Sequence, residues 1–342
     1  MSPTSIDFSD TAVAILNWNG KKWLEEFLPS VVAYSSNASI YVIDNASDDQ
    51  SVEFLSKNYP GIYLIQHKTN LGFCKGYNLG LSQIKAKYFV LLNSDVEVTS
   101  DWLSAPIGYL KKNPDVAAVQ PKIKSWYQKE YFEYAGAAGG AIDKFGYPFC
   151  RGRLFEEIEK DKRQYEEIAE ISWASGACLF IRADLYKAEG GLDERFFAHM
   201  EEIDLCWRLK NKGYKIIYHP GSEVFHVGGG TLQKANSFKT FLNFRNSLIM
   251  LHKNLPGREL FFIVVSRLFL DGIAGIKFLL EGKPSFVISI IKAHLSYYSF
   301  IGEINNNRKK NSVSAPDNFR EKYSLLWQYY IKKVRKYECL PK

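Results

Sequence analysis

The chain has 342 residues, of which 46% are hydrophobic, and it carries 44 Lys and Arg against 37 Asp and Glu. This length exceeds one ordinary compact domain, so a large α/β domain with an appendage is expected. The five cysteines contain no C-x-x-C pair, which excludes a disulfide framework and indicates free thiols in a reducing compartment. Because no basic and apolar leader precedes Thr11, no secretory signal is predicted and a cytoplasmic protein is expected.

Charge is distributed unevenly along the chain. Residues 231–342 carry 19 Lys and Arg against 7 Asp and Glu, a net charge of +12 that leaves −5 for the remainder. A mildly acidic part is therefore joined to a basic, aromatic-rich tail. Such a tail suits nucleic acid or anionic lipid.

The first half of the chain alternates short apolar runs with helix-like stretches. Short buried strands separated by helices predict a doubly wound, mostly parallel α/β sheet. The predicted strands cover residues 12–16, 40–43, 62–65 and 88–92, and the predicted helices cover residues 22–32, 51–58 and 78–84.

Polar turns follow these predicted strands. Asn17 lies in the first turn and Asp44 in the second, and the segment Asn70–Asn78 adds glycines that allow a close approach of backbone to a ligand. Because such turns meet at the carboxyl edge of the sheet, they predict a pocket of donors and acceptors that suits a nucleotide. Neither a P-loop nor a G-x-G-x-x-G motif is present, so phosphate must be neutralised in another way.

An acidic cluster ends the fourth predicted strand. Asn93 and Asp95 lie two residues apart on an extended segment, so their side chains point the same way and could share one hard cation. A metal at Asp95 would neutralise the phosphate. The alternative is a strand followed by an ordinary polar turn.

Two further candidates lie in the second half of the chain, where the pattern is irregular after Gln120. Glu201 and Glu202 lie near the positive N-terminus of a predicted helix, and the helix dipole alone could explain both acids. His226 precedes a run of glycines typical of a mobile loop that covers a ligand, although a lone His is usually structural.

The tail contains two predicted amphipathic helices. The first is mostly apolar between Leu260 and Leu280, with Arg267, Asp271, Lys277 and Glu281 along one narrow stripe. The second follows a break at Gly282 and Pro284, and neither helix has the 18 or more nearly uncharged residues of a membrane span. The pair either packs on the main domain or lies in a bilayer interface. The wide apolar faces, followed by basic clusters at 308–310 and 332–336, favour lipid, and no nucleic-acid-binding module is present.

Taken together and in this order, these segments resemble glycosyltransferase family 2, specifically its rhamnosyltransferase-like members with the GT-A fold. The resemblance covers about residues 11–255. The motifs that carry it are Leu16–Gly20, Asp44–Ser47, Asn70–Phe73, Asn78–Gly80, Leu91–Asp95, Gly190–Leu205 and His226–Gly229.

The resemblance implies a GT-A catalytic domain over residues 1–255, with a nucleotide-sugar half at about 11–120 and an acceptor half at about 121–255. Residues 256–342 would form a basic, amphipathic, membrane-associating helical tail. In the nucleotide pocket, Asp44 would contact the base or ribose, with Asn17, Asn70, Asn78 and Asn93 beside it.

The resemblance also implies the chemistry of the site. Asp95 would hold a divalent cation, Mg²⁺ or Mn²⁺, that bridges the diphosphate, and His226 would complete the metal site. Glu202 would be the general base, with Glu201 as the alternative within the acidic pair. Two departures stand out: Asn93 occupies the place of the first Asp of the usual DxD motif, and Glu202 replaces the usual Asp of the acidic pair.

The implied function is inverting transfer of a sugar from a nucleoside-diphosphate sugar, with dTDP-rhamnose as one candidate donor, to a hydroxyl of a glycan acceptor. A lipid-linked acceptor at the inner face of the cell membrane, in bacterial surface polysaccharide synthesis, would explain the tail. A positioned carboxylate would deprotonate the acceptor, and a hard cation would neutralise the leaving group.

Two other functions are considered. A sugar nucleotidyltransferase would need a glycine-rich basic loop after the first strand, which residues 17–20 do not provide. A non-catalytic, membrane-associated partner that binds nucleotide sugar is disfavoured by the presence of Asp95, Glu202 and His226.

Overall fold

A computed structural model describes residues 6–228, 237–310 and 319–341 of the chain. The strands are β1 (Thr11–Asn17), β2 (Ser39–Asp44), β3 (Tyr63–Gln66), β4 (Tyr88–Asn93), β5 (Val96–Val98), β6 (Val116–Ser125), β7 (Gly140–Ile142), β8 (Pro148–Cys150), β9 (Arg153–Leu154), β10 (Glu157–Ile158), β11 (Ala169–Glu170), β12 (Cys178–Arg182) and β13 (Lys215–His226). The helices are α1 (Lys21–Tyr34), α2 (Ser51–Asn58), α3 (Gly72–Ser82), α4 (Ser104–Lys112), α5 (Ala183–Ala188), α6 (Glu201–Asn211), α7 (Ser237–Asn254), α8 (Gly257–Leu280) and α9 (Pro284–Lys310), with short turns η1 (Glu194–Phe196), η2 (Trp327–Ile331) and η3 (Tyr337–Cys339).

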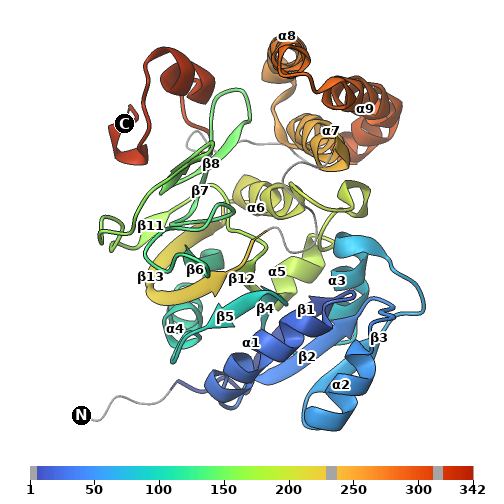
Figure 1. Cartoon of the computed structure of the whole chain (residues 1–342), viewed down its shortest axis with the longest axis vertical. Coiled ribbons are helices and arrows are strands. Elements are labelled where there is room, and N and C mark those ends of the chain that lie inside the picture. Colours follow the sequence, from blue (N-terminus) through green and yellow to red (C-terminus); the bar gives the residue numbers. More distant parts are fainter. Residues whose placement is uncertain (1–5, 229–236, 311–318, 342) are drawn as a thin grey trace.

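The main sheet has nine strands in the order β11-β13-β6-β12-β4-β1-β2-β3, with β5 beside β13 (Figure 1). Strands β3, β2, β1 and β4 are parallel to one another, which confirms the doubly wound first half. The second half is mixed, because β12 runs antiparallel to β4 and β6 whereas β13 is parallel to β6. The carboxyl ends of β1, β2 and β4 therefore meet at one sheet edge, as the sequence predicts.

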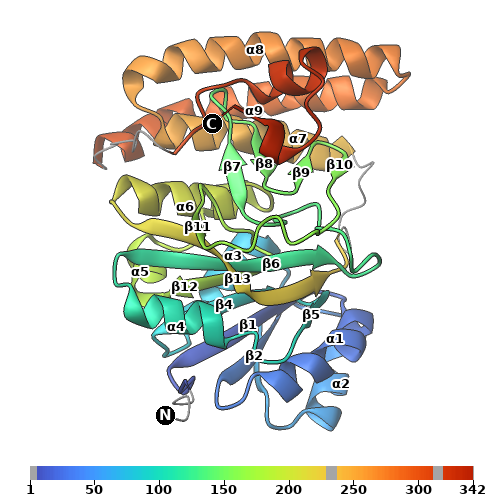
Figure 2. The ribbon, with the colours of Figure 1, turned by 90° about the vertical axis from the view of Figure 1, so that its left-hand side faces the viewer.

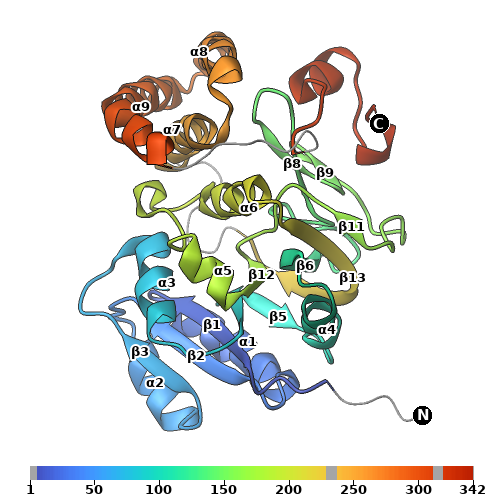
Figure 3. The same cartoon turned by 180° about the vertical axis from the view of Figure 1, so that it is seen from behind.

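Helices cover both faces of this sheet (Figures 1 and 3). Helices α1, α2 and α4 bury Leu28, Leu55 and Ile107 in one apolar core. Helices α3, α5 and α6 contribute to the other, which continues into α7. A four-stranded antiparallel sheet, β10-β9-β8-β7, packs against the C-terminal segment.

The segment Asn70–Asn78 is helical from Gly72 rather than the predicted ligand-binding turn. The reason is close packing of α3 on the sheet. A Cβ on Gly80 would lie 2.4 Å from Cδ1 of Ile43, and one on Gly76 would lie 3.0 Å from Cδ1 of Leu16. These two glycines allow the helix to approach β1 and β2 closely. They do not serve a close approach of backbone to a ligand, as the sequence predicted.

Helices α7, α8 and α9 form a layer above α6 (Figure 2), and the predicted break between the last two falls at Gly282, whose φ is 70°. The first half of the polar stripe of α8 lies against the protein, with Arg267 2% exposed and Asp271 0% exposed, whereas Lys277 and Glu281 are exposed. Among the described residues, no helix is both long enough and apolar enough to cross a bilayer.

Candidate active site

At the carboxyl ends of β1 and β2, Asn17 lies beside Asp44 in the parallel register. The Asn17 Nδ2 donates to Asp44 Oδ1 at 3.0 Å and to Ser47 Oγ at 3.1 Å, and the Ser47 backbone N–H donates to Asp44 Oδ2 at 3.0 Å. Both Asn17 and Asp44 are buried. Asn17 thus orients the Asp44 carboxylate, and the contact of Asp44 with a nucleotide stays a prediction.

Asn45, which the sequence analysis did not single out, holds the next turn. Its Nδ2 donates to Asn70 Oδ1 at 2.9 Å and to the Gly72 carbonyl at 3.0 Å, and its Oδ1 accepts the Leu71 N–H at 3.0 Å. Asn70 Oδ1 also accepts the Gly72 N–H at 2.9 Å at the start of α3. The buried Asn45 side chain, beside Asp44, therefore fixes the position of Asn70 at the start of α3.

Asn78 joins α3 to the loop that precedes the acidic pair. Its Nδ2 donates to the Leu192 carbonyl at 2.7 Å, and its Oδ1 accepts the Tyr186 hydroxyl at 2.7 Å and the Leu192 N–H at 2.9 Å. The structure gives this side chain a bracing role. Its predicted place in the nucleotide pocket stays a prediction.

Asp95 and His226 lie side by side although 131 positions separate them. They meet because the end of β13 pairs with β5, which follows Asp95 directly. His226 Nε2 lies 3.2 Å from Asp95 Oδ1 and 3.5 Å from Asn93 Nδ2, and His226 Nδ1 lies 3.4 Å from Glu133 Oε2. Glu133, in the irregular part of the sequence, was missed because only the fold brings it here.

Opposing effects set the protonation of this histidine. Burial by itself would lower the pKa of His226, but the Asp95 and Glu133 carboxylates outweigh it and raise the pKa to about 10. Burial likewise opposes ionisation of Asp95, yet the charge and hydrogen bond of His226 hold the pKa of that carboxyl below its ordinary value. In this structure His226 is an imidazolium that lies between the carboxylates of Asp95 and Glu133.

The geometry of this pair suits two adjacent ligands of one cation. Two donors at about 2.1 Å from a metal at right angles are about 3 Å apart, close to the 3.2 Å between Asp95 Oδ1 and His226 Nε2. Glu133, beside the other ring nitrogen, matches the carboxylate that usually orients a metal-binding histidine. Among the described residues, no three His, Cys, Asp or Glu side chains are grouped as a metal site. A cation here would need further oxygens from a diphosphate and water, and its binding would release the imidazole proton.

The acidic pair begins α6, as predicted. The Oε2 atoms of Glu201 and Glu202 are buried and have no hydrogen-bond partner among the described residues. Buried polar atoms are usually paired, so an unpaired carboxyl oxygen at a helix start indicates a place for an incoming donor. The segment before the pair has three non-glycine residues with positive φ, Phe197 (64°), His199 (68°) and Met200 (74°).

Two contacts connect the acidic pair with the sheet edge. A Cβ placed on Gly176 would lie 3.8 Å from Glu202 Cβ and 3.8 Å from Phe73 Cζ. The next residue, Ala177, accepts the Asn93 N–H at 3.0 Å. Glu202 is thus linked through Gly176 and Ala177 to the end of β4, where Asn93 and Asp95 lie. The structure brings the predicted base and the predicted metal ligands to the same part of the sheet edge.

Burial raises the pKa of both carboxyls, and their other interactions separate the two values. It raises the pKa of Glu202 to about 7, against the opposing effect of hydrogen bonds from backbone N–H groups that include that of Gly176. It also raises the pKa of Glu201, and repulsion from Glu202 raises it further. Glu202 is therefore the first of the pair to ionise near neutral pH, while Glu201 stays protonated.

A base with this acidity predicts a pH profile. We expect kcat/KM to decrease as the pH falls through about 7, because below its pKa Glu202 is protonated and cannot accept the acceptor's proton. Initial rates of nucleoside diphosphate release between about pH 5.5 and about pH 9 would measure this. Donor binding measured over the same range serves as the control. A rate that stays constant down to about pH 5 would contradict the assignment.

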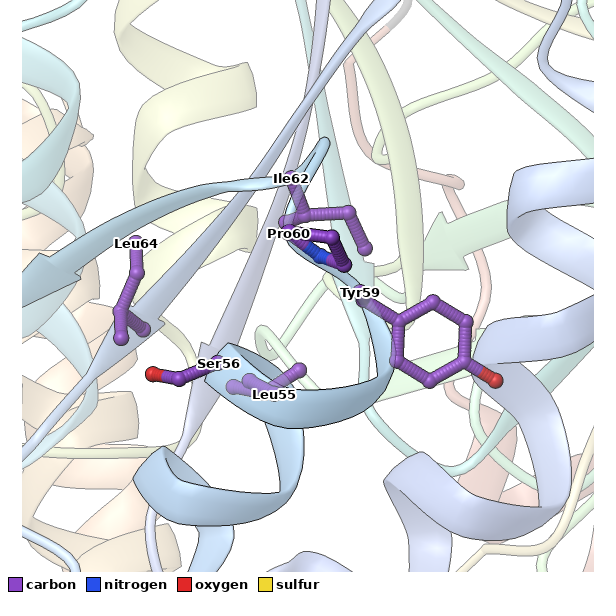
Figure 4. Close-up of a pocket in the computed structure, with 6 residues that line it drawn as sticks. All are labelled: Leu55, Ser56, Tyr59, Pro60, Ile62 and Leu64. Carbon is purple, nitrogen blue, oxygen red and sulfur yellow. The ribbon is translucent and has the colours of Figure 1, made fainter.

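A separate pocket of ≈ 280 Å³ lies between α2 and β3 (Figure 4). It is lined by Leu55, Ser56, Tyr59, Pro60, Ile62 and Leu64. This mostly apolar lining contains no carboxylate, imidazole or cation, so the pocket provides no group for transfer chemistry.

The mostly parallel α/β sheet has polar turns at its carboxyl edge and an acidic pair at the start of α6, and sequence comparison identifies the family of enzymes. The profile of glycosyl transferase family 2 matches residues 12–188, more than half of the chain, so this protein belongs to glycosyltransferase family 2. This confirms the resemblance noted from its motifs and favours sugar transfer over nucleotidyl transfer.

Among its relatives, the chain is 27% identical over 219 residues to N-acetylglucosaminyl-diphospho-decaprenol L-rhamnosyltransferase of Mycobacterium tuberculosis, covering 59% of this chain and 71% of the relative. It is 22% identical over 221 residues to rhamnosyltransferase WbbL of Escherichia coli K12, covering 63% and 82%. The rhamnosyltransferase-like character of the sequence is thereby confirmed.

Solved structures show the same GT-A fold. The structure of GalNAc-T7 with UDP, GalNAc and Mn²⁺ superposes with a TM-score of 0.57 at 16% identity, covering 90% of this chain and 58% of that one. Staphylococcus aureus TarS in complex with UDP-GlcNAc gives a TM-score of 0.54 at 14% identity, covering 88% and 92%. At these identities the likeness shows the fold alone.

Proposed function

We propose that this protein is an inverting glycosyltransferase that moves a sugar from a nucleoside-diphosphate sugar to a hydroxyl of a lipid-linked glycan at the cytoplasmic face of a bacterial membrane, in surface polysaccharide synthesis. The catalytic part of the proposal rests on Glu202. This residue has a buried carboxyl oxygen without a hydrogen-bond partner and a pKa raised to about 7, and it is linked to the sheet edge that presents Asp95. The rhamnosyltransferase relatives make dTDP-rhamnose the first donor to test.

The proposed chemistry is one in-line displacement. Glu202 accepts the proton of the acceptor hydroxyl as its oxygen bonds to the anomeric carbon, and the bond from that carbon to the diphosphate breaks on the opposite face. Asp95 and His226 would hold Mg²⁺ or Mn²⁺, which supplies Lewis-acid stabilisation of the leaving diphosphate. Two relatives in fold were solved with Mn²⁺, GalNAc-T7 and, at a TM-score of 0.52 and 13% identity, the mannosyltransferase PcManGT with GDP-Man.

The experiment that tests this function is a screen of the purified protein against nucleotide sugars. Release of nucleoside diphosphate is measured with Mg²⁺, with Mn²⁺ and with EDTA, in the presence of a polyprenyl-diphosphate-linked sugar acceptor. The proposal expects acceptor-dependent release with one donor, and loss of that release in EDTA. Failure of every donor and acceptor pair would contradict it.

The membrane part of the proposal comes from the α8–α9 hairpin, in which apolar side chains are exposed and an ion pair is buried. Large apolar side chains point away from the protein, with Phe269 72% exposed and Leu280 84% exposed, while Arg267 and Asp271 are buried beneath them. We call these exposed side chains the apolar face; it consists of Phe261, Phe262, Val265, Leu268, Phe269, Ile273, Ile276, Leu279, Leu280, Ile288, Ile291 and Leu295. This arrangement is unfavourable in water and favourable against lipid.

Groups suited to a membrane interface surround the apolar face. Lys277, Lys283 and Lys292 are exposed on the hairpin, and Trp327 and Tyr330 are exposed on the C-terminal segment. The Lys277 ammonium lies 5.6 Å from the centre of the Tyr330 ring, which places that segment beside α8. Amphipathic aromatic rings and lysines favour anionic headgroups.

In the basic clusters predicted to follow the helices, Lys332, Lys333 and Lys336 are exposed, whereas two arginines contact the protein. Arg308 donates to the carbonyls of His252 and Leu255, and Arg335 stacks on Tyr329. Both arginines are therefore engaged with the protein. Two exposed lysines of the hairpin, Lys277 and Lys292, are adjacent in sequence to Ile276 and Ile291 of the apolar face.

We expect full-length protein to sediment with vesicles of anionic phospholipid at low salt, and the double variant Phe269→Glu/Ile276→Glu to lose binding by about tenfold or more, because two anchoring side chains become charged. Co-sedimentation measures the bound fraction. The matched control is Ile168→Glu, which replaces an exposed apolar residue of the β10–β11 loop and should bind normally. Full-length protein that stays in the supernatant, or self-association that persists without lipid, would contradict the membrane assignment.

A further inference from the structure

The turn that delivers the acidic pair is held in an unfavourable backbone conformation. Phe197, His199 and Met200 have φ angles of 64°, 68° and 74°, a region that residues with a Cβ rarely adopt. Such a conformation persists only where neighbouring groups stabilise it. Since Glu201 and Glu202 follow Met200 directly, whatever stabilises this turn also fixes where the carboxylates point.

A single buried side chain of α7 binds most of this turn. The Asn246 Nδ2 lies 2.9 Å from the Phe196 carbonyl, 2.8 Å from the Ala198 carbonyl and 2.8 Å from the His199 carbonyl. Its Oδ1 accepts from Arg245 Nε at 2.9 Å, which fixes the orientation of the amide. Three carbonyl oxygens thus converge on one donor group that has no exposed surface.

Other residues of α7 bind the two ends of the same segment. Lys253 Nζ lies 2.5 Å from Asp193 Oδ2 and 2.6 Å from Asp204 Oδ2, and Asn254 Nδ2 donates to Asp204 Oδ1 at 2.8 Å. These contacts hold Asp193, before the turn, and Asp204, inside α6. Arg245 of α7 also binds the start of the turn, because its Nη2 donates to the Arg195 carbonyl at 2.9 Å and to the Phe196 carbonyl at 3.2 Å. The Ala198 and His199 carbonyls, inside the turn, are bound by Asn246.

Helix α7 is itself anchored on its other side. Figures 1 and 3 show it between α6 and the α8–α9 hairpin. Arg267 donates to Ser247 Oγ at 2.8 Å, and His252 is hydrogen-bonded to the Tyr297 hydroxyl and to Asn305, both at 2.9 Å. The amide of Asn246 therefore projects from a helix that is fixed from both sides.

We propose that Asn246 is a positioning residue for the transfer reaction, whose amide holds the Phe196–Met200 turn so that Glu202 meets the acceptor hydroxyl. This inference rests on the proposed function, because it concerns the same carboxylate. It commits to the chemistry of the amide nitrogen. Removing that nitrogen leaves the Ala198 and His199 carbonyls without their donor, whereas the Phe196 carbonyl still accepts from Arg245 Nη2 and the Ala198 N–H. Replacing the nitrogen with oxygen places a negative group against these carbonyls.

Three variants test the role. Asn246→Ala removes the donor, and Asn246→Asp keeps the shape of the side chain but removes the N–H groups. Asn254→Ala is the matched control, because it also removes a buried amide of α7 but releases α6 at Asp204 and not the turn. All are measured as full-length protein for Tm, for donor Kd, for kcat and KM with the donor that supports turnover in the screen, and for hydrogen–deuterium exchange of residues 196–204.

Both Asn246 variants are expected to lower kcat by about 10- to 100-fold while donor Kd stays within about twofold, since only the placement of the base changes. They should also speed exchange in residues 196–204 more than Asn254→Ala does. Asn254→Ala should lower Tm and keep kcat within about twofold, because an internal bond is lost without moving the turn.

The result that overturns the inference is an Asn246→Asp protein with the kcat and exchange of Asn254→Ala, or a loss that appears only in donor Kd. The underlying function fails in a different way. If Glu202→Gln is fully active, the proposed base is wrong, whereas an inactive Glu202→Gln with active Asn246 variants rejects the positioning role alone.

Discussion

Replacement of Glu202 by Gln is expected to lower kcat by about 10²–10⁴-fold, because the amide keeps the size of the side chain but cannot accept the acceptor's proton. Donor Kd should change little, since the side chain lies at the start of α6 and makes no hydrogen bond to Asn17, Asp44 or Asn70 in the described structure. Steady-state release of nucleoside diphosphate and equilibrium binding of the donor measure the two quantities separately. The same substitution at Glu201 should cost less, because that carboxyl is the one that stays protonated.

Stability provides an internal control for this variant. Folding raises the pKa of Glu202 to about 7, so its contribution to stability is present at low pH and is lost as the pH rises through about 7. Glu202→Gln should therefore have a higher Tm than the unmodified protein at about pH 8, with the difference shrinking toward about pH 5. An inactive variant that is more stable at high pH separates loss of chemistry from loss of fold. Full activity in both Glu201→Gln and Glu202→Gln would reject the mechanism.

Replacement of Asp95 by Ala is expected to abolish the metal dependence of nucleotide binding. Asp95 is the predicted anionic ligand, and without it a cation would meet only the neutral amide of Asn93 and the imidazole of His226. Titration of Mn²⁺ in the presence of nucleoside diphosphate, followed by calorimetry, measures the effect independently of turnover. His226→Ala should weaken binding less, because carboxylate and phosphate oxygens still surround the cation.

The controls for the metal are Asn93→Ala and EDTA. Asn93→Ala should retain most Mn²⁺-dependent binding, since Asn93 would supply at most one neutral oxygen. EDTA should reduce binding by the unmodified protein to the level of Asp95→Ala. Full turnover in excess EDTA would remove Asp95 and His226 from any metal site.

Strands β1 to β4 and their doubly wound order followed from the local pattern, because buried parallel strands are short continuous apolar runs bounded by polar turns. Helix α3 followed from it only in its C-terminal part, because the predicted helix covers residues 78–84 and α3 begins at Gly72. Gly76 and Gly80 are typical of turns, but here they lie inside a helix that packs tightly on Leu16 and Ile43. Helix propensity is a weak preference, and the close approach to the sheet decides the outcome.

The residues of the candidate site divide in the same way. Asp44, Asp95 and Glu202 could be predicted because each follows or begins an element recognisable from its own neighbours in the sequence. Glu133 and Asn246 could not. The fold alone places the first beside His226 and the second beneath the strained turn, across 93 and 50 positions in the chain respectively.

The sequence by itself determined that the tail would form two amphipathic helices with a break at Gly282, because polar residues recur there at helical spacing. Only the tertiary structure decided which face is buried. Periodicity defines two faces without stating what each one meets. Tyr147 and Ser247 bind the Arg267–Asp271 pair, and His294 adds a third hydrogen bond, so this pair turns toward the protein. Because a buried ion pair needs such partners and an apolar side chain does not, the hairpin buries the Arg267–Asp271 pair and presents its apolar face outward.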